Sequence, residues 1–367
     1  MLQTGHHHTQ GLDQLRSAPI ADRIQSGREA DRPDGKRKAD QSAQSRRQAD
    51  RIGSGSSEGA IMSTKIEWTD ETWNPITGCT VKSAGCRDCY AMTLAGTRLK
   101  NHPSRAGLTR QNAAGKHIWT GEVRFNQAWL DQPLKWKKPR MIFVCAHGDL
   151  FHEDVPDEWI DRVFAVMSLC QQHVFQVLTK RADRMREYVL SRVAMQGNIG
   201  GCAVALALQL GKQVSGGVTT TYPAKSDMVR DLVIERVRNI LPNVWLGTSV
   251  EDQEAADERI PDLLETPAAV RWLSCEPLLG SIDFDDIWWQ RAVWDAIAGV
   301  VDYDSAIDWV VLGGESGNTA RPMHPDWARQ IRAQCEGANV PFFFKQWGGM
   351  VAGRAFSTDA VLGISGR

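Results

Sequence analysis

Short apolar runs alternate with longer amphipathic stretches from residue 141 onward. The runs are rich in β-branched and aromatic residues and read MIFVC, VFQVL, VWLG, VRWLS, WVVLGG and PFFF. Between them, PDEWIDRVFAVMSLC, PDWARQIRAQC and DQEAADERIPDLL carry apolar residues at helical spacing, and Pro261 predicts a break or kink in the last of these. Strands that alternate with helices indicate parallel βαβ units. We therefore expect an α/β fold: a parallel (β/α) partial or full barrel of about six to eight strands.

Each apolar run is followed at once by polar or glycine residues. In (β/α) barrels the functional groups lie at the C-terminal ends of the strands. The candidates here are Asp149, Lys180, Glu251, Glu276, Glu315 and Lys345. Lys180, Arg181 and Lys345 could hold a carboxylate or phosphate, and Asp149, Glu251 and Glu276 could bind ammonium or hydroxyl groups. We take Asp149, Lys180, Glu276 and Lys345 as catalytic candidates; the alternative is a network of salt bridges that closes the mouth of the barrel.

The regions outside this pattern define the expected domain limits. Residues 1–62 are polar and contain no Trp, Tyr or Phe, which predicts a disordered extension. Residues 63–352 form the predicted barrel domain. Two stretches interrupt its rhythm, near 194–226 and 286–308, and we interpret both as insertions that include helices. Residues 353–367 are weakly patterned and predict a frayed tail.

Composition narrows the cellular context. The 43 Lys and Arg nearly balance the 44 Asp and Glu, so the net charge of −1 gives no overall attraction to nucleic acid or membrane. The longest mostly apolar run, residues 199–210, is much shorter than the roughly 20 residues that span a bilayer. Eight cysteines at uneven spacing, without a secretory signal, favour metal binding or catalysis over disulfides. We expect a cytoplasmic protein.

Three cysteines carry the clearest chemical signal. Cys79, Cys86 and Cys89 form C-x₆-C-x₂-C on a glycine-flanked loop, and YAMTLAGTRL behind it predicts a helix. Three thiolates on one loop are typical ligands of zinc or of an iron–sulfur cluster. No fourth cysteine lies nearby, which favours a [4Fe-4S] cluster with one open iron. Zinc remains the alternative if a histidine completes a four-ligand site, and the candidates are His102, His117 and His147.

Nine segments resemble a bacteriophage-derived family of unknown function, often labelled phage protein Gp thirty-seven/Gp sixty-eight. The resemblance covers residues 64 to 349 apart from the insertions, and it rests on IEWTDETWNPITGCT, AGCRDCYA, GDLFHEDVP, FQVLTKRADR, NVWLGTSVEDQEAADERI, LSCEPLLG, WVVLGGESG, ARPMHPDW and PFFFKQWGG. That family is similar to a divergent branch of the radical S-adenosylmethionine superfamily. The superfamily's usual motif is C-x₃-C-x₂-C, so this chain departs in its first spacing. It also carries Asp88 where an aromatic residue often precedes the last cysteine.

The resemblance implies roles for several residues. Cys79, Cys86 and Cys89 would bind three irons of the cluster, and the fourth iron would bind S-adenosylmethionine, whose reductive cleavage starts radical chemistry. Gly313, Gly314 and Glu315 resemble a segment that meets the amino group of this cofactor, although glycines there could simply permit a tight turn. Glu251 and Tyr90 are further cofactor-binding candidates; Tyr90 could equally anchor the loop.

Two classes of function follow. The first is a radical S-adenosylmethionine-type enzyme of unknown substrate, for which occurrence in phages favours nucleic-acid modification or repair. The second is a non-enzymatic phage accessory module that holds zinc or a cluster and binds nucleic acid or a partner protein. The resemblance also suggests a partner, a genetic neighbour called the three-Cys-motif partner protein.

Overall fold

The structure, a computed structural model, describes residues 66–194, 241–284, 307–317 and 319–349. The expected extension at 1–62, the tail at 353–367 and nearly all of the two expected insertions lie outside these residues. The chain divides into two compact units, 1–71 and 72–367, and only Ile66–Glu71 of the first is described. No helix in the described ranges is long and apolar enough to cross a membrane.

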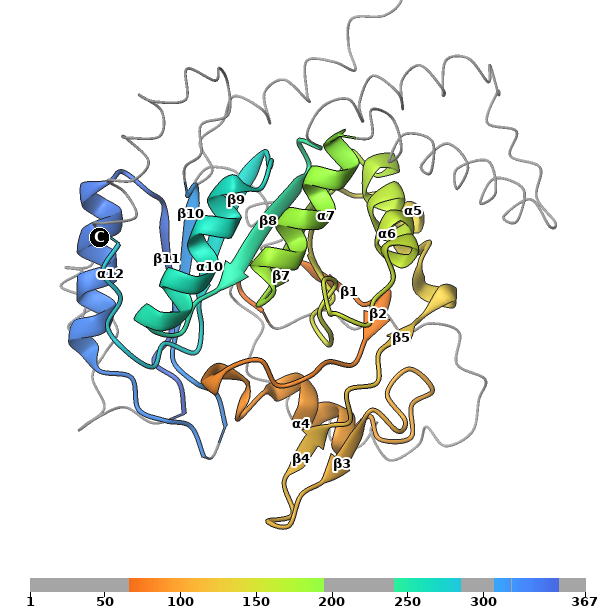
Figure 1. Cartoon of the computed structure of the whole chain (residues 1–367), viewed down its shortest axis with the longest axis horizontal. Helices are drawn as coiled ribbons and strands as arrows, with labels where there is room; N and C mark the ends of the chain where they lie inside the picture. Colours follow the sequence, from red (N-terminus) through yellow and green to blue (C-terminus); the bar gives the residue numbers. More distant parts are fainter. Residues whose placement is uncertain (1–65, 195–240, 285–306, 318, 350–367) are drawn as a thin grey trace, which may run out of the picture. The chain divides into compact units, whose positions relative to one another are not determined.

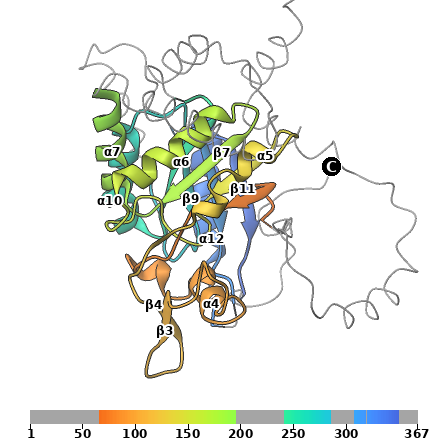
Figure 2. The same ribbon diagram turned by 90° about the vertical axis from the view of Figure 1, so that its right-hand side faces the viewer.

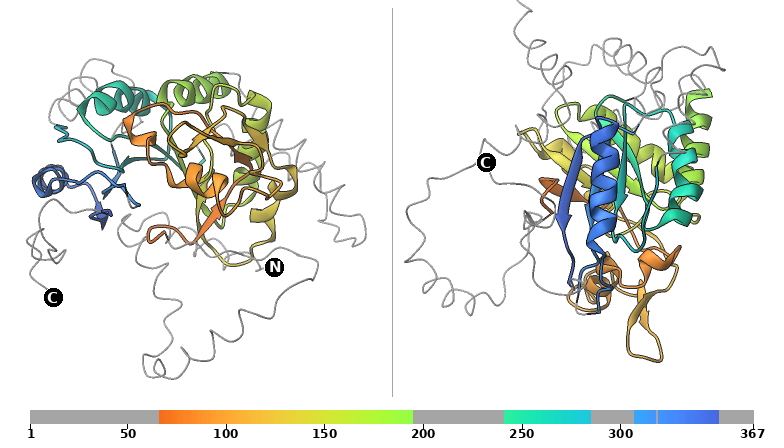
Figure 3. Two further views of the ribbon diagram at one scale, coloured as in Figure 1. Left: turned by 90° about the horizontal axis from the view of Figure 1, so that it is seen from below. Right: turned by 90° about the vertical axis from the view of Figure 1, so that its left-hand side faces the viewer.

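A seven-stranded sheet, in the order β1-β6-β7-β8-β9-β10-β11, is the centre of the fold. Its strands are β1 Glu71–Trp73, β6 Met141–Val144, β7 Val174–Thr179, β8 Val244–Ser249, β9 Val270–Cys275, β10 Trp309–Gly313 and β11 Phe342–Gln346. All five pairings from β6 to β11 are parallel. The sheet curls into half of a barrel, as the left view of Figure 3 shows from below. The prediction of a partial parallel barrel is thus confirmed.

In the described ranges, a helix follows each of β6, β7, β8 and β10, and two shorter helices precede β6. The helices are α4 Tyr90–Gly96, α5 Gln132–Lys135, α6 Asp157–Leu169, α7 Ala182–Ala194, α10 Gln253–Glu265 and α12 Pro325–Gly337. In Figures 1 and 2, α7 and α10 lie side by side against one face of the sheet, and α12 lies beside β11. The helix α10 continues through Pro261, so a break there is wrong, and the alternative of a kink stays a prediction.

The strands are buried because both of their faces are covered. Every residue of β8, β9 and β10 is buried, which explains why these runs are continuously apolar rather than alternating. On one face, Val244, Leu246 and Leu273 pack in the main core with Ala256 and Ile260 of α10. Burial of these side chains fixes the helices against the sheet.

Short strands connect the first part of the chain to this sheet. They form two antiparallel pairs, β2 Ile76–Thr77 with β5 Arg124–Phe125 and β3 Thr109–Gln111 with β4 His117–Trp119. A single-turn helix at Gln127–Trp129 follows β5. In Figures 1 and 2, α4 and the β3–β4 hairpin lie below the central strands, at the end to which the arrowhead of β8 points. The cysteine loop, residues 79–89, connects β2 to α4 and therefore lies at the C-terminal ends of the parallel strands.

Candidate metal centre

The cysteine loop is a compact turn. Cys79 follows β2, Cys86 ends a short helical turn at Ala84–Cys86, and Cys89 directly precedes α4. Two backbone hydrogen bonds close the turn. The amide of Cys86 donates to the carbonyl of Ser83 at 3.0 Å, and the amide of Cys89 donates to the carbonyl of Cys86 at 3.3 Å. Gly78 has a φ of +95°, and a Cβ there would lie 2.1 Å from the carbonyl oxygen of Glu122. Glycine is therefore required where the chain enters the loop.

All three thiols are partly buried. Cys79 and Cys89 pack against a small apolar cluster formed by Ala91, Met92, Ala95, Leu108 and Trp119. Burial and Asp149 raise the pKa of the Cys79 thiol, Arg181 opposes the rise, and the Cys86 and Cys89 thiols add to it. The Cys86 and Cys89 thiols are therefore near enough to affect ionisation of the Cys79 thiol. No set of three His, Cys, Asp or Glu residues in the described ranges is positioned as a metal-binding group.

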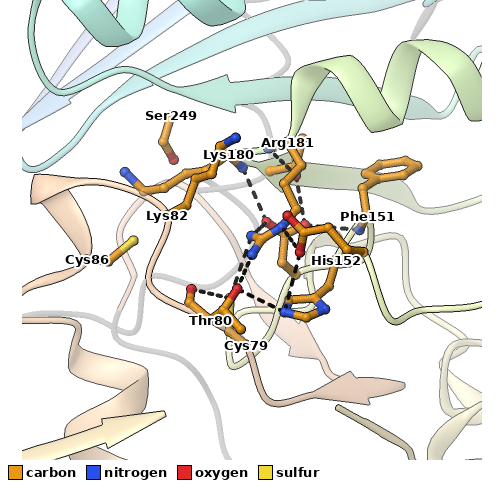
Figure 4. Close-up of polar contacts among 12 residues, drawn as sticks. Cys79, Thr80, Lys82, Cys86, Phe151, His152, Lys180, Arg181 and Ser249 are labelled. Carbon is orange, nitrogen blue, oxygen red and sulfur yellow. Dashed lines mark hydrogen bonds and ion pairs between the residues drawn. The ribbon is translucent and has the colours of Figure 1, made fainter. Parts of the chain in front are cut away.

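Arg181 anchors the start of the loop, as Figure 4 shows. Its Nη2 donates to Thr80 Oγ1 at 2.5 Å, and its Nη1 lies 3.8 Å from the sulfur of Cys79. Asp149 accepts from Nη1 of Arg181 at 3.0 Å and also from the hydroxyl of Thr179 at 2.7 Å. His152 reaches Thr80 Oγ1 through Nε2 at 3.0 Å. The residue after Cys79 is thus fixed by two side chains from the ends of neighbouring strands.

Lys180 and Glu251 hold the middle of the loop. Lys180 Nζ donates to Glu251 Oε2 at 2.8 Å and to Ser83 Oγ at 3.4 Å, and the amide of Gly85 donates to Glu251 Oε1 at 3.4 Å. Arg259 donates to the same carboxylate at 2.9 Å. Burial by itself raises the pKa of Glu251, but Lys180 and Arg259 lower it to about 2. The carboxylate is therefore ionised at neutral pH.

Glu315 reaches the loop through Arg321. The amide and Nε of Arg321 donate to Glu315 Oε2 at 2.8 and 2.9 Å, and its Nη2 donates to the carbonyl of Ala84 at 2.9 Å. The glycines before Glu315 permit close backbone contact: a Cβ on Gly314 would lie 2.1 Å from the carbonyl oxygen of Trp347. The contact at Gly314 favours the alternative that the glycines permit a tight turn. A role of Gly313 and Gly314 in cofactor binding stays a prediction.

The last charged pair has no hydrogen bond to the loop among the described residues. Glu276 pairs with Lys345, from the ends of β9 and β11. Glu276 is also 3.3 Å from the position that a Cβ on Gly313 would take. Tyr90 follows Cys89; the residue is 46% exposed, and its hydroxyl donates to the carbonyl of Ala146 at 2.6 Å. Within the described ranges, Glu276 and Lys345 form an ion pair with each other and none with the cysteine loop.

Residues 63–361 match the model of a family described as a protein of unknown function, DUF5131. The chain belongs to the DUF5131 family. No curated protein and no solved structure matches the chain.

In this DUF5131 chain, four of the predicted strand-end groups meet the cysteine loop. Lys180 and Glu251 do so directly, Asp149 acts through Arg181, and Glu315 acts through Arg321. Each of these groups is also part of an ion pair, as the salt-bridge interpretation expected. The catalytic and cofactor roles of these residues stay predictions.

Two arginines that organise the site were not among the candidates. Arg259 lies on α10, two turns beyond Glu251, and Arg321 lies six residues beyond Glu315. A weak signal existed for both, because each arginine follows its carboxylate closely in the sequence. The roles of Thr80 and His152 had no signal, since their contact depends on the tertiary fold.

The three histidines considered for a zinc site have other partners in DUF5131. The Nδ1 of His102 is 2.7 Å from Ser104 Oγ, and the Nδ1 of His147 accepts from Arg105 at 2.8 Å. His117 packs on α4, where a Cβ on Gly96 would lie 2.2 Å from its ring. None of them belongs to a metal-binding group in the described ranges. The candidate donors on the loop itself are the three cysteines.

Proposed function

We propose that Cys79, Cys86 and Cys89 bind a [4Fe-4S] cluster and that the chain is a radical S-adenosylmethionine-type enzyme of unknown substrate. The observation that carries this proposal is the position of the three-thiol loop at the C-terminal ends of a curled parallel sheet, where barrel enzymes carry their active sites. Nucleic acid is the substrate class that we favour, on the proposed resemblance to a bacteriophage-derived family.

The donor chemistry fits a three-thiolate cluster. The loop carries three cysteines and no histidine, and two of the cysteines, Cys79 and Cys89, lie against apolar side chains. Arg181, 3.8 Å from the Cys79 sulfur, places positive charge where thiolates would form. Metal binding replaces the thiol proton, so burial that disfavours a free thiolate is offset when a metal ion is bound.

When bound, such a cluster with one open iron supplies the electron that cleaves S-adenosylmethionine. The chain's own residues hold the loop and provide charge around it. Glu276 has the most exposed carboxylate of the four strand-end pairs, at 18% against 2%, 3% and 7% for Glu251, Glu315 and Asp149. We therefore assign substrate contact to Glu276 and Lys345, and positioning of the loop to Asp149 and Lys180. Glu251, Glu315 and the Tyr90 ring are the proposed cofactor contacts.

Anaerobic reconstitution of the full chain tests the proposal. We expect about four iron and four sulfide per chain, and a change in the electron paramagnetic resonance spectrum of the reduced protein when S-adenosylmethionine is added. Cys86→Ala should lose both. Cys170→Ala is the matched control, because Cys170 is buried at the end of α6, away from the loop. The iron content of this variant should equal that of the natural chain.

The rival function has its own signature. A chain that purifies with one zinc and does not respond to S-adenosylmethionine would overturn the enzyme proposal. It would instead favour the accessory module that binds nucleic acid or a partner protein. Loss of that zinc on replacement of His102, His117 or His147 would identify the fourth ligand.

A further inference from the structure

Positive charge is concentrated in one part of the chain. Residues 79–126, which comprise the cysteine loop, α4, the β3–β4 hairpin and β5, contain eight Lys and Arg but only two Asp and Glu. Their net charge is therefore +6, although the net charge of the whole chain is −1. We call residues 79–126 the basic segment, and the structure describes all of it. Because the rest of the chain is acidic on balance, the positive charge is a local property of this segment.

The basic segment extends across the C-terminal end of the sheet, from β6 toward α10. Burial, Arg105 and Arg98 lower the pKa of His147, which follows β6, so Arg98 lies near the end of that strand. Lys82 of the cysteine loop pairs with Glu258 of α10 at 3.3 Å. The helix α4 packs against both strands of the hairpin, which makes the segment one compact piece. Positive charge therefore lies beside the ends of several strands.

The two carboxylates of the basic segment are already engaged in ion pairs. The side chain of Asp88 is 5% exposed; it accepts from Arg87 at 3.0 Å and also pairs with Lys116 in the β3–β4 turn. Asp88 further accepts from the hydroxyl of Thr319 at 3.0 Å, which joins the segment to the chain that follows β10. Glu122, the other carboxylate, pairs with a neighbouring arginine of β5. The segment therefore has no unpaired carboxylate to offset its remaining cations.

Three cations of the basic segment are exposed and form no ion pair among the described residues. They are Arg98 and Lys100, which follow α4, and Arg110 on β3. The seven residues of α4 span about 10 Å, so the cations on either side of this helix are close enough to act on one ligand. The strand-end carboxylates Asp149 and Glu251 are buried in ion pairs of their own. The surface beside the cysteine loop should therefore attract anions.

We propose that the basic segment is the docking surface for a single strand of nucleic acid, which it brings to the cysteine loop. A strand carries a phosphate at every nucleotide, so it can neutralise several cations of the segment at once and release their counterions. Five of the eight cations are arginines, whose planar fork suits phosphate oxygens. The inference rests on the proposed function, because it names the substrate of the same site. A base stacked inside a duplex is not accessible to a reactive centre, which favours a single strand.

Fluorescence anisotropy of labelled single-stranded DNA tests this surface on the full chain without metal. An oligonucleotide of about 12 nucleotides covers the site size of common single-strand-binding domains. The combined variant Arg98→Gln, Lys100→Gln, Arg110→Gln removes the three exposed, unpaired cations. We expect it to bind at least about tenfold more weakly at low salt, and to reduce the slope of log affinity against log salt by about 2, since each phosphate contact contributes about 0.7.

A second combined variant controls for net charge. Lys135→Gln, Lys137→Gln, Lys138→Gln removes the same charge from exposed positions that precede β6, at the opposite end of the sheet. This variant should bind the DNA as the natural chain does. Circular dichroism of both variants checks that they fold, which we expect because all six side chains are exposed.

Several outcomes would overturn the proposal. The docking surface is refuted if the natural chain does not bind the strand, or if the two combined variants bind it equally well. Duplex DNA of the same sequence binding as tightly would refute the preference for a single strand. Displacement of the DNA by polyglutamate at equal charge would favour an acidic protein partner instead. Because binding is measured without metal, it can fail while anaerobic reconstitution still yields four iron per chain, and the reverse, so the two proposals are tested separately.

Discussion

Buried arginines lie at two corners of the C-terminal end of the sheet, beside the cysteine loop. The two corners differ in whether a carboxylate balances the arginine's charge. At the β7–β8 corner, Arg181 and Arg259 face the buried carboxylates of Asp149 and Glu251. At the β6 corner, the hydrogen-bond partners of Arg105 within the described residues are a neutral imidazole and a hydroxyl. The first corner balances its own charge and fixes the loop. The second leaves Arg105 with neutral hydrogen-bond partners and no ion pair among the described residues.

The largest difference between the corners should appear when a buried carboxylate is removed. Glu251→Gln leaves Lys180 and Arg259 without their shared counter-charge, and we expect a loss of about 3–5 kcal/mol in the free energy of unfolding. Denaturant unfolding monitored by circular dichroism measures this. A loss below about 1 kcal/mol would show that the β7–β8 corner does not depend on its ion pairs.

Acid should weaken the β7–β8 corner in a defined pH range. The pKa of Glu251 falls from its ordinary value of 4.5 to about 2 in the folded chain. The stabilisation of the fold by ionised Glu251 is therefore complete above pH 4.5 and is lost as the pH falls toward 2. The pKa shift corresponds to about 3 kcal/mol in the free energy of unfolding. The difference in unfolding free energy between the natural chain and Glu251→Gln should shrink over this range. A difference that is independent of pH would contradict the prediction.

The β6 corner should respond to acid earlier and less strongly. The folded pKa of His147 is lowered from 6.5 to about 4, so its neutral form stabilises the fold above pH 6.5, and this stabilisation is lost as the pH falls toward 4. We expect this loss to be about 2 kcal/mol in the free energy of unfolding, because partial exposure of His147 weakens the effect. Nuclear magnetic resonance titration of the ring gives the pKa directly, and a value near 6.5 would refute the lowered pKa. His147→Gln should remove this part of the pH dependence.

The smallest effect is expected at the outer edge of the loop. Lys82 pairs with Glu258 at 3.3 Å, and their side chains are 29% and 51% exposed. Lys82→Gln should change the free energy of unfolding by less than about 1 kcal/mol, because water and salt screen exposed pairs. The same denaturant measurement provides the scale against which Glu251→Gln is judged. A loss comparable to that of Glu251→Gln would mean that exposure does not separate the two pairs.

The repeating half of the fold could be predicted because burial leaves a local pattern in the sequence. MIFVC, VFQVL and WVVLGG are strands in the structure, since a parallel sheet covered on both faces requires continuous apolar runs. The short strands β2 to β5 were not predicted. They span two or three residues each and owe their pairing to tertiary contacts rather than to a local pattern.

The candidate site could be predicted only in part, for a similar reason. The cysteine spacing is local, and the strand-end charges follow from the repeat, so both were found. The unbalanced charge of Arg105 depends on which groups the fold brings around it, and a linear sequence does not show that. Pro261 does not end α10, although proline lacks the N–H that would bond to the carbonyl four residues earlier.

The sheet's strand order has a consequence for synthesis of the chain on the ribosome. From β6 to β11, each new strand pairs with the one made before it, so the sheet can extend as the chain emerges. The cysteine loop is different, because it is made early and touches segments made late. Arg321 donates to the carbonyl of Ala84, which lies 237 residues earlier in the sequence, and Thr319 donates to Asp88, which lies 231 residues earlier. The set of charges around the cysteines is therefore completed only after most of the protein has left the ribosome.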